Sequence, residues 1–220
     1  MSARLYLRQL QLGPMRNFVY LVGRADRPET AVIDPAWDVP ALLRAAEEDG
    51  RRLTHAFVSH RHFDHMNGVV PLLEAQELRV VLHRDDAQPL ARELPGSSLD
   101  LVGGGESVDV GGLAIACIHT PGHTPGSQCF HVAGADALFS GDTVFAGACG
   151  RCDLEGGDPA RMFDSLTRVL GALPAETQLY PGHDYGDVPV SSLAREREHN
   201  PYLRFPDAAA FSAYRQRPRG

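Results

Sequence analysis

The sequence predicts an α/β fold in which two β-sheets lie face to face, with helices on their outer faces. Two observations lead to this prediction: the chain has two strand-rich halves, and helical patterns flank each half. At 220 residues the chain is long enough to bury one large core. Because no linker or low-complexity stretch divides it, we expect a single domain over residues 1–220.

The first half begins with three strand-like runs separated by turn signals, which is typical of an antiparallel meander. A helix follows, because apolar residues recur at helical spacing and Gly50 ends the pattern. The apolar run 56–58 is short and bounded, as expected for a buried strand. The elements expected in this half are strands at 5–10, 18–22 and 30–33, a helix at 39–49, a strand at 56–58, a helix at 67–75, a strand at 79–82 and a helix at 85–94 that ends before residues 95–96.

The second half follows the same plan without obvious sequence repetition. Gly111-Gly112 marks a compact hairpin turn. Asp158-Pro159 marks a helix start, since Asp caps a helix and Pro suits its first turn. The elements expected in this half are strands at 107–110, 113–118, 127–132 and 137–140, a helix at 158–170, a strand at 177–180 and helices at 192–199 and 207–215.

Composition argues against several classes of function. The 21 Lys and Arg residues are outnumbered by 28 Asp and Glu residues, and the net charge of −7 disfavours a nucleic-acid surface. No apolar run is long enough to span a membrane. Residues 1–12 contain Arg4 and Arg8 without a continuous apolar core, so they do not read as a secretory signal. We therefore expect a cytoplasmic monomer or homodimer that binds neither nucleic acid nor membrane.

The four cysteines are compatible with a reducing compartment. Cys149-Gly-Arg-Cys152 has the C-x-x-C spacing of redox pairs, but no strand-to-helix pattern of the thioredoxin type surrounds it and no second pair accompanies it. We expect both thiols to pack within a loop.

Residues 59–68 contain the densest cluster of functional groups in the chain. His60, His62, Asp64 and His65 follow the expected strand 56–58 and form the pattern His-x-His-x-Asp-His. A loop at the carboxyl end of such a strand is where open α/β sheets bind ligands. Imidazole nitrogens and carboxylate oxygens are donors that Zn, Fe and Mn accept. The pattern therefore predicts a metal site rather than an ordinary polar loop.

Three more donors follow apolar runs at sharp Gly- or Pro-containing turns: His123, Asp142 and His183. Because each comes at the end of an expected strand, we expect all three at the same sheet edge as His60. The other histidines match no such pattern, and we expect packing or surface roles for them, with His119 as the first exception because it lies near His123. They are His55, His83, His119, His131 and His199.

Through these residues the chain resembles the metallo-β-lactamase superfamily over nearly all of its length. The resemblance implies an αββα sandwich with two mixed sheets. It also implies two divalent metal ions, zinc in the first place and iron or manganese as alternatives. It assigns His60, His62 and His123 to one ion, Asp64, His65 and His183 to the other, and Asp142 to a bridging position.

Such a metal pair implies hydrolysis. A water shared by two dications loses a proton near neutral pH, and the resulting hydroxide attacks a carbonyl or phosphoryl group. Asp64 is the candidate catalytic residue, because a ligating carboxylate can also orient the hydroxide and accept its proton. The alternative for Asp64 is a role as ligand only.

Two stretches resemble the short, single-domain glyoxalase II-like proteins, the hydroxyacylglutathione hydrolases: Ala148-Cys149-Gly150-Arg151 and His183-Asp184-Tyr185. The resemblance implies a small thiol-derived substrate, cleaved at its thioester. It also implies that Arg151 binds a substrate carboxylate and that Tyr185 contacts the thiol part. A structural salt bridge and a core aromatic are the respective alternatives. The segment after His183 lacks the helical C-terminal domain of longer glyoxalase II, which leaves glutathione specificity open.

Other activities remain open at this point. Persulfide dioxygenases share the scaffold and hold one iron at the positions of His60, His123 and Asp142, a two-His-one-carboxylate triad. Phe63 before Asp64 and the Gly-Asp-Thr around Asp142 favour hydrolysis instead. A purely structural metal site is disfavoured, since such sites are closed and rich in Cys. A true β-lactamase is disfavoured because no export signal is visible.

Overall fold

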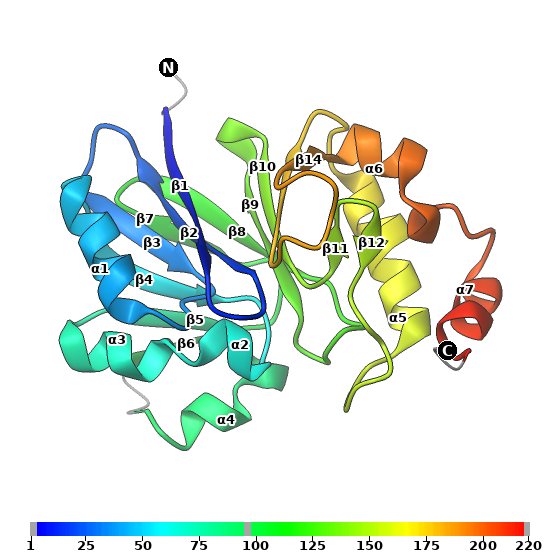
Figure 1. Cartoon of the computed structure of the whole chain (residues 1–220), viewed down its shortest axis with the longest axis horizontal. Coiled ribbons are helices and arrows are strands. Elements are labelled where there is room, and N and C mark those ends of the chain that lie inside the picture. Colours follow the sequence, from blue (N-terminus) through cyan, green and yellow to red (C-terminus); the bar gives the residue numbers. More distant parts are fainter. Residues whose placement is uncertain (1–3, 95–97, 218–220) are drawn as a thin grey trace.

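The computed structural model describes residues 4–94 and 98–217, and two six-stranded sheets form its centre (Figure 1). The predicted helix stop at residues 95–96 lies outside the described residues. The first sheet has the strand order β1 (Leu5–Leu12), β2 (Asn17–Arg24), β3 (Glu29–Ile33), β4 (Arg52–Val58), β5 (Arg79–His83) and β6 (Leu99–Val102). The second has the order β14 (Ser191–Ser192), β13 (Gln178–Pro181), β10 (Ala137–Gly141), β9 (Gln128–Val132), β8 (Leu113–His119) and β7 (Ser107–Val110).

Both sheets are mixed. In the first, β1, β2 and β3 pair antiparallel, which confirms the predicted meander, and β3 to β6 pair parallel. In the second, β10 and β13 pair parallel, while the other pairs are antiparallel. A small antiparallel ribbon, β11 (Val144–Phe145) with β12 (Ala148–Cys149), follows β10.

The helices cover the outer faces of the two sheets (Figure 1). Beside the first sheet are α1 (Val39–Glu48), α2 (Phe63–Met66), α3 (Val69–Ala75) and α4 (Gln88–Ala91). Beside the second are α5 (Pro159–Asp164), α6 (Leu193–His199) and α7 (Ala208–Arg215). Within residues 4–94 and 98–217, every helix is too short or too polar to cross a lipid bilayer.

Three apolar layers hold this arrangement together. Side chains alternate along a strand, so β2 sends Val19 and Leu21 toward α1 and α3, and Tyr20 and Val22 toward the second sheet. A third layer, which includes Leu138 of β10, packs the second sheet against α5 to α7. A strand buried on both faces is apolar along its length, which explains the unbroken run of large apolar residues in β2. The layers confirm the predicted αββα sandwich.

The prediction was wrong about where a helix follows the histidine loop. It placed a single helix at 67–75, but α2 begins at Phe63 and includes Asp64 and His65, and α3 begins only at Val69. Gly68 separates the two helices, because its N–H donates to the carbonyl of Pro35 at 3.0 Å. A Cβ at position 68 would lie 2.8 Å from that oxygen, so the close approach requires glycine.

The predicted helix 85–94 is also shorter than expected: a 3₁₀ turn (Arg84–Asp86) precedes α4. The Asp86 carboxylate accepts hydrogen bonds from the backbone N–H groups of Arg61 and Gly126, at 3.1 and 3.0 Å, and so holds this segment against the donor loops. The predicted helix 158–170 continues past α5 as a π-helical turn (Ser165–Val169). The strands β11, β12 and β14 were not predicted, since two residues carry no readable alternation, and β6 was not predicted either.

Candidate metal centre

Four strand ends bring the predicted donors together at one edge of the sandwich. His60 follows β4 of the first sheet, and His123, Asp142 and His183 follow β8, β10 and β13 of the second. The sheets are tied together here, because the N–H of Phe18 donates to the carbonyl of Gly182 at 2.8 Å. The predicted convergence of the seven donors at one sheet edge is therefore observed.

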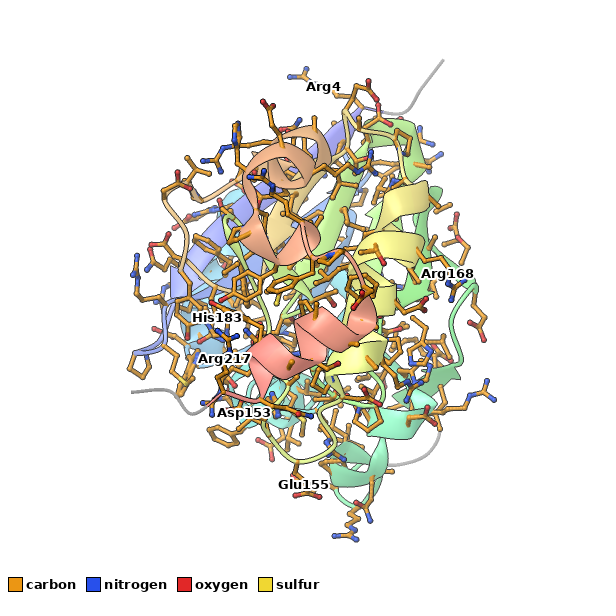
Figure 2. All side chains as sticks on the ribbon, turned by 90° about the vertical axis from the view of Figure 1, so that its right-hand side faces the viewer. Arg4, Asp153, Glu155, Arg168, His183 and Arg217 are labelled. Atoms are coloured by element: carbon orange, nitrogen blue, oxygen red, sulfur yellow. The ribbon has the colours of Figure 1, made fainter. Side chains whose placement is uncertain are left out.

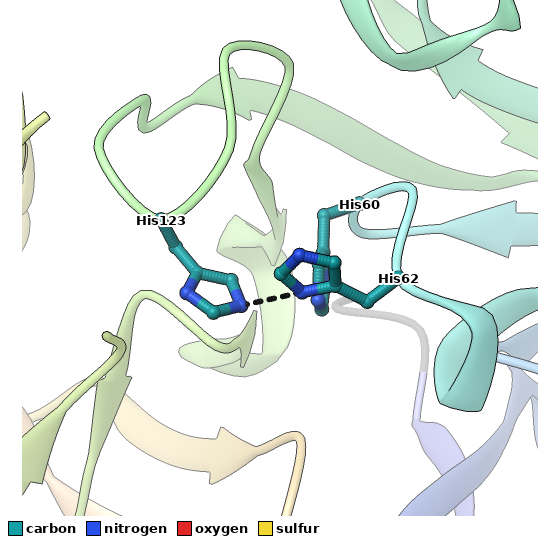
Figure 3. A group of neighbouring side chains, drawn as sticks. All are labelled: His60, His62 and His123. Carbon is teal, nitrogen blue, oxygen red and sulfur yellow. Dashed lines mark hydrogen bonds between the residues drawn. The ribbon is translucent and has the colours of Figure 1, made fainter. Parts of the chain in front are cut away.

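One group of donors consists of three imidazoles, His60, His62 and His123 (Figure 3). His62 Nδ1 lies 2.9 Å from His123 Nε2. The ring of His60 is 4.8 Å, centroid to centroid, from each of the other two rings. We call these three residues the first cluster.

A second group consists of Asp64, His65 and His183, which we call the second cluster. His65 Nε2 lies 3.0 Å from His183 Nε2. Asp64 Oδ2 lies 3.3 Å from His183 Nε2 and 3.5 Å from His65 Nε2. The donor atoms of the second cluster are thus as close together as those of the first.

Asp142 lies between the clusters. Its Oδ2 is 3.4 Å from His123 Nε2 of the first cluster. Its Oδ1 is 3.3 Å from His65 Nε2 and 3.4 Å from His183 Nε2, both in the second cluster. One carboxylate oxygen therefore faces each cluster, which is the arrangement that a bridging ligand needs.

The donor set fits a pair of metal ions. His60 Nε2 and Asp142 Oδ1 are buried without a hydrogen-bond partner in the described structure, and such atoms carry a free-energy cost unless something coordinates them. Ring nitrogens of facing histidines lie at about hydrogen-bond distance from each other. One cation bound by both rings can accept a lone pair from each. Neutral imidazole and carboxylate are suitable ligands for zinc or iron.

The first cluster favours neutral imidazoles. Burial lowers the pKa of His60 well below its ordinary value, and the neighbouring imidazoles of His65 and His123 lower it further. Burial, reinforced by His123, lowers the pKa of His62 to about 4. These histidines are therefore unprotonated at neutral pH, as metal ligation requires.

The second cluster attracts positive charge. Burial alone would lower the pKa of His65, but the carboxylates of Asp142 and Asp34 outweigh it and raise that pKa well above the ordinary value. The nearby carboxylates of Asp142 and Asp64 likewise outweigh burial and raise the pKa of His183 to about 9. The carboxylates stabilise a cation here, either protons on the imidazoles or a metal ion in their place.

Asp34 is a residue of the site that the sequence analysis missed. Its carboxylate lies 2.9 Å from His65 Nδ1 and accepts hydrogen bonds from the N–H and Oγ of Ser59, at 2.6 and 2.7 Å. Ser59 Oγ in turn lies 2.9 Å from His60 Nδ1. Asp34 has φ of 51°, an uncommon value outside glycine. In the sequence, Asp34-Pro35 directly follows the expected strand 30–33, and an Asp after a buried strand is a usable signal.

Backbone carbonyls orient the other imidazoles. His123 Nδ1 lies 2.7 Å from the carbonyl oxygen of Arg151, and His183 Nδ1 lies 2.9 Å from that of Met15. With Nδ1 engaged, each ring presents Nε2 to the cluster. The side-chain N–H of Asn17 donates to Asp64 Oδ2 at 3.0 Å and fixes that carboxylate.

A cavity of about 910 Å³ opens beside the clusters, and both predicted substrate contacts line it. Tyr185 stacks on His183, with ring centroids 4.4 Å apart and planes at 5°, and its side chain is 50% exposed, so it is not a core aromatic. Arg151 is paired with Asp153 through two N–O contacts of 2.9 and 3.0 Å. The positions agree with the predicted roles, and the roles themselves stay predictions.

The remaining histidines and the cysteines lie outside this centre. His83 and His119 stack at 4.0 Å and, with Asp85, form a further group of possible donors. All four cysteines lie within the described residues, are buried and form no disulfide. Cys149 and Cys152 pack in the apolar layer beneath α5 and α7.

Comparison with known proteins identifies the family. Residues 12–183 match the model of the metallo-beta-lactamase superfamily, and the chain belongs to this superfamily. The family and the clustered donors together make it a metal-dependent hydrolase in broad class.

Individual relatives differ in their described functions. The chain is 30% identical over 204 residues to PksB of Bacillus subtilis (strain 168), a probable polyketide biosynthesis zinc-dependent hydrolase, covering 91% of this chain and 88% of PksB. It is 39% identical over 188 residues to the hydroxyacylglutathione hydrolase of Rhodospirillum rubrum, covering 86% of this chain and 70% of that protein. The crystal structure of ETHE1 from Myxococcus xanthus is similar with a TM-score of 0.86 and 32% identity, covering 97% of this chain and 92% of the other.

Proposed function

We propose that the protein cleaves the thioester of hydroxyacylglutathione or a related acyl-thiol, using two divalent metal ions, zinc in the first place. The observation that carries this proposal is the position of Asp142, with one oxygen facing each cluster. The hydroxyacylglutathione hydrolase of R. rubrum and the zinc-dependent hydrolase PksB support the reaction type and the metal.

The seven donors would hold the ions as the sequence predicts: the first cluster one, the second cluster the other, and Asp142 both. When bound, the ions supply an acidified water as nucleophile and a Lewis acid for the thioester carbonyl. The chain then needs no Ser or Cys nucleophile.

Asp64 is proposed to act mainly as a ligand that orients the nucleophile. Burial would raise its pKa, but His183, His65 and the hydrogen bond from Asn17 together outweigh burial and hold the pKa well below the ordinary range. A carboxylate with so low a pKa is a weak proton acceptor. Asn17 fixes its orientation through the 3.0 Å hydrogen bond.

Tyr185 is proposed to contact the thiol part of the substrate. Its ring extends the surface of His183 into the cavity, and its exposed side leaves room for a ligand. Arg151 is less suited to bind a substrate carboxylate, because Asp153 already accepts from two of its donors.

The test combines metal analysis with turnover. Protein purified without added metal should contain about two ions per chain and should release lactate from S-lactoylglutathione without oxygen uptake. One iron per chain, with oxygen consumed in the presence of glutathione persulfide, would contradict the proposal and favour the dioxygenase. That activity would need only His60, His123 and Asp142, whereas here Asp64, His65 and His183 are equally close together.

A further inference from the structure

The cavity is more cationic than the chain around it. Its lining includes the guanidinium groups of Arg151, Arg215 and Arg217 and the carboxylates of Asp64 and Asp142. Both carboxylates are candidate metal ligands, so metal binding would leave the wall more positive still. The chain as a whole has a net charge of −7. A positive cavity in a negative protein concentrates anionic ligands.

Two of the three arginines have structural partners. Arg151 forms the bidentate pair with Asp153. The Arg215 guanidinium donates to the carbonyl of Gly150 at 2.8 Å and lies 5.2 Å from the ring centre of Tyr202. These contacts fix the loop around Gly150 and the end of α7 against each other.

Arg217 differs from both. It follows α7, its side chain is exposed, and within residues 4–94 and 98–217 no carboxylate lies at ion-pair distance from it. Its guanidinium carbon lies 5.7 Å from the ring centre of Tyr214. Arg217 and His183 both line the cavity, and Figure 2 labels them on the side of the view opposite to Arg168. Arg217 is therefore a cation at the cavity that has no acidic partner among the described residues.

The rim of the cavity also gathers exposed apolar side chains. Six large apolar residues are exposed in the described structure, and all except Leu101 line this cavity. Concentrated exposed apolar surface marks a binding site rather than ordinary surface. The five are Met15, Phe63, Leu154, Tyr185 and Tyr214.

We propose that Tyr214 and Arg217, at the end of α7, form the recognition site for an anionic group, a carboxylate or a phosphate, on the thiol part of the substrate. This inference rests on the proposed thioesterase function and deepens it. Arg217 would be the specificity-determining residue, because its donors are available and guanidinium binds carboxylate and phosphate in a bidentate manner. Arg151 would serve mainly to shape the loop.

The experiment compares three acetyl thioesters that differ only in the thiol: N-acetylcysteamine, which is neutral, glutathione, which carries carboxylates, and coenzyme A, which carries phosphates. Wild type, Arg217→Gln, Arg217→Lys and the control Arg44→Gln, an exposed arginine on α1, are assayed by thiol release. Equilibrium binding of the uncleavable S-methyl derivatives of the same thiols is measured by calorimetry.

Arg217→Gln should lower the ratio of kcat/KM for the preferred anionic thioester to that for the neutral one by roughly fivefold, mainly through KM, as expected for an exposed ion pair. Binding of the matching S-methyl derivative should weaken by the same factor. Arg217→Lys should keep most of the preference, and Arg44→Gln should keep all of it. The identity of the preferred thiol distinguishes carboxylate from phosphate recognition.

An unchanged ratio in Arg217→Gln, or an equal loss for all three thioesters, would overturn the inference. Failure of the proposed function looks different: wild type would cleave none of the three. In that case the inference is tested by the binding measurements alone. Equal affinity of wild type and Arg217→Gln for the anionic S-methyl derivatives would overturn the inference.

Discussion

The two donor clusters occupy one sheet edge but differ in charge. The first cluster contains three imidazoles, and burial lowers the pKa of His60 and His62. The second cluster places imidazoles between carboxylates, which raise the pKa of His65 and His183 despite burial. Two sites at the same sheet edge can therefore differ in proton affinity, depending on whether carboxylates surround the imidazoles.

This contrast has a consequence for metal binding. A metal ion entering the first cluster meets the neutral imidazoles of His60 and His62, whereas one entering the second must displace protons. Asp142 belongs to both clusters, so it couples them.

The largest effect is expected for Asp142→Asn. An amide keeps the shape but loses the charge that faces both clusters, so both ions should bind poorly. Thioester hydrolysis should fall roughly a thousandfold, since Lewis-acid stabilisation contributes several kcal/mol. Steady-state kinetics with metal analysis of the same sample tests this expectation. Normal metal content with normal turnover would refute the bridging role.

His62→Ala should separate the clusters. It removes one ligand of the first cluster and leaves Asp64, His65 and His183 intact. Metal content should fall from about two ions to about one, and hydrolysis should fall roughly a hundredfold or more. A one-iron oxygenase could instead keep part of its activity. His199→Ala, at an exposed histidine of α6, is the matched control and should change neither quantity.

A smaller effect is expected for Asp34→Asn. The carboxylate orients His65 directly and His60 through Ser59, so its loss should misalign one ligand in each cluster. Removing an outer partner of this kind typically costs roughly tenfold to a hundredfold in metal affinity or activity. Competition with a metal chelator measures the affinity. Unchanged affinity for both ions would show that Asp34 only supports the fold.

Sequence reasoning located the donors because metal ligands need particular residue types and these follow strand ends. His60 and Asp142 could be identified from that pattern alone. Asp34 could not, since a partner of the ligands is recognisable only when the structure brings Ser59 and His65 to it. Arg217 was also missed, because its position depends on how α7 packs on α5 and is held by Arg215.

The smallest effect concerns the pH dependence of the metal-free protein. The pKa of His183 is raised to about 9 in the folded protein, against about 6.5 in the unfolded chain. Protonated His183 therefore stabilises the fold, fully below pH 6.5, and this stabilisation is lost as pH rises through 9. The lowered pKa of His62, about 4, acts oppositely, so stability is lost as pH falls from about 6.5 toward 4.

Chemical unfolding of metal-free protein at pH 5, 7 and 9 should therefore show a maximum near pH 7, with changes of about 1–2 kcal/mol to either side. His183→Gln should remove the alkaline loss, and His62→Gln should remove the acid loss. Stability that rises steadily across this range would contradict the assigned difference between the clusters.

The most direct test of the two-ion account is anomalous diffraction from crystals of the protein loaded with zinc. The account predicts two peaks about 3.5–4 Å apart, one within the first cluster and one within the second, with Asp142 contacting both. A single peak held by His60, His123 and Asp142, with Asp64, His65 and His183 uncoordinated, would contradict it.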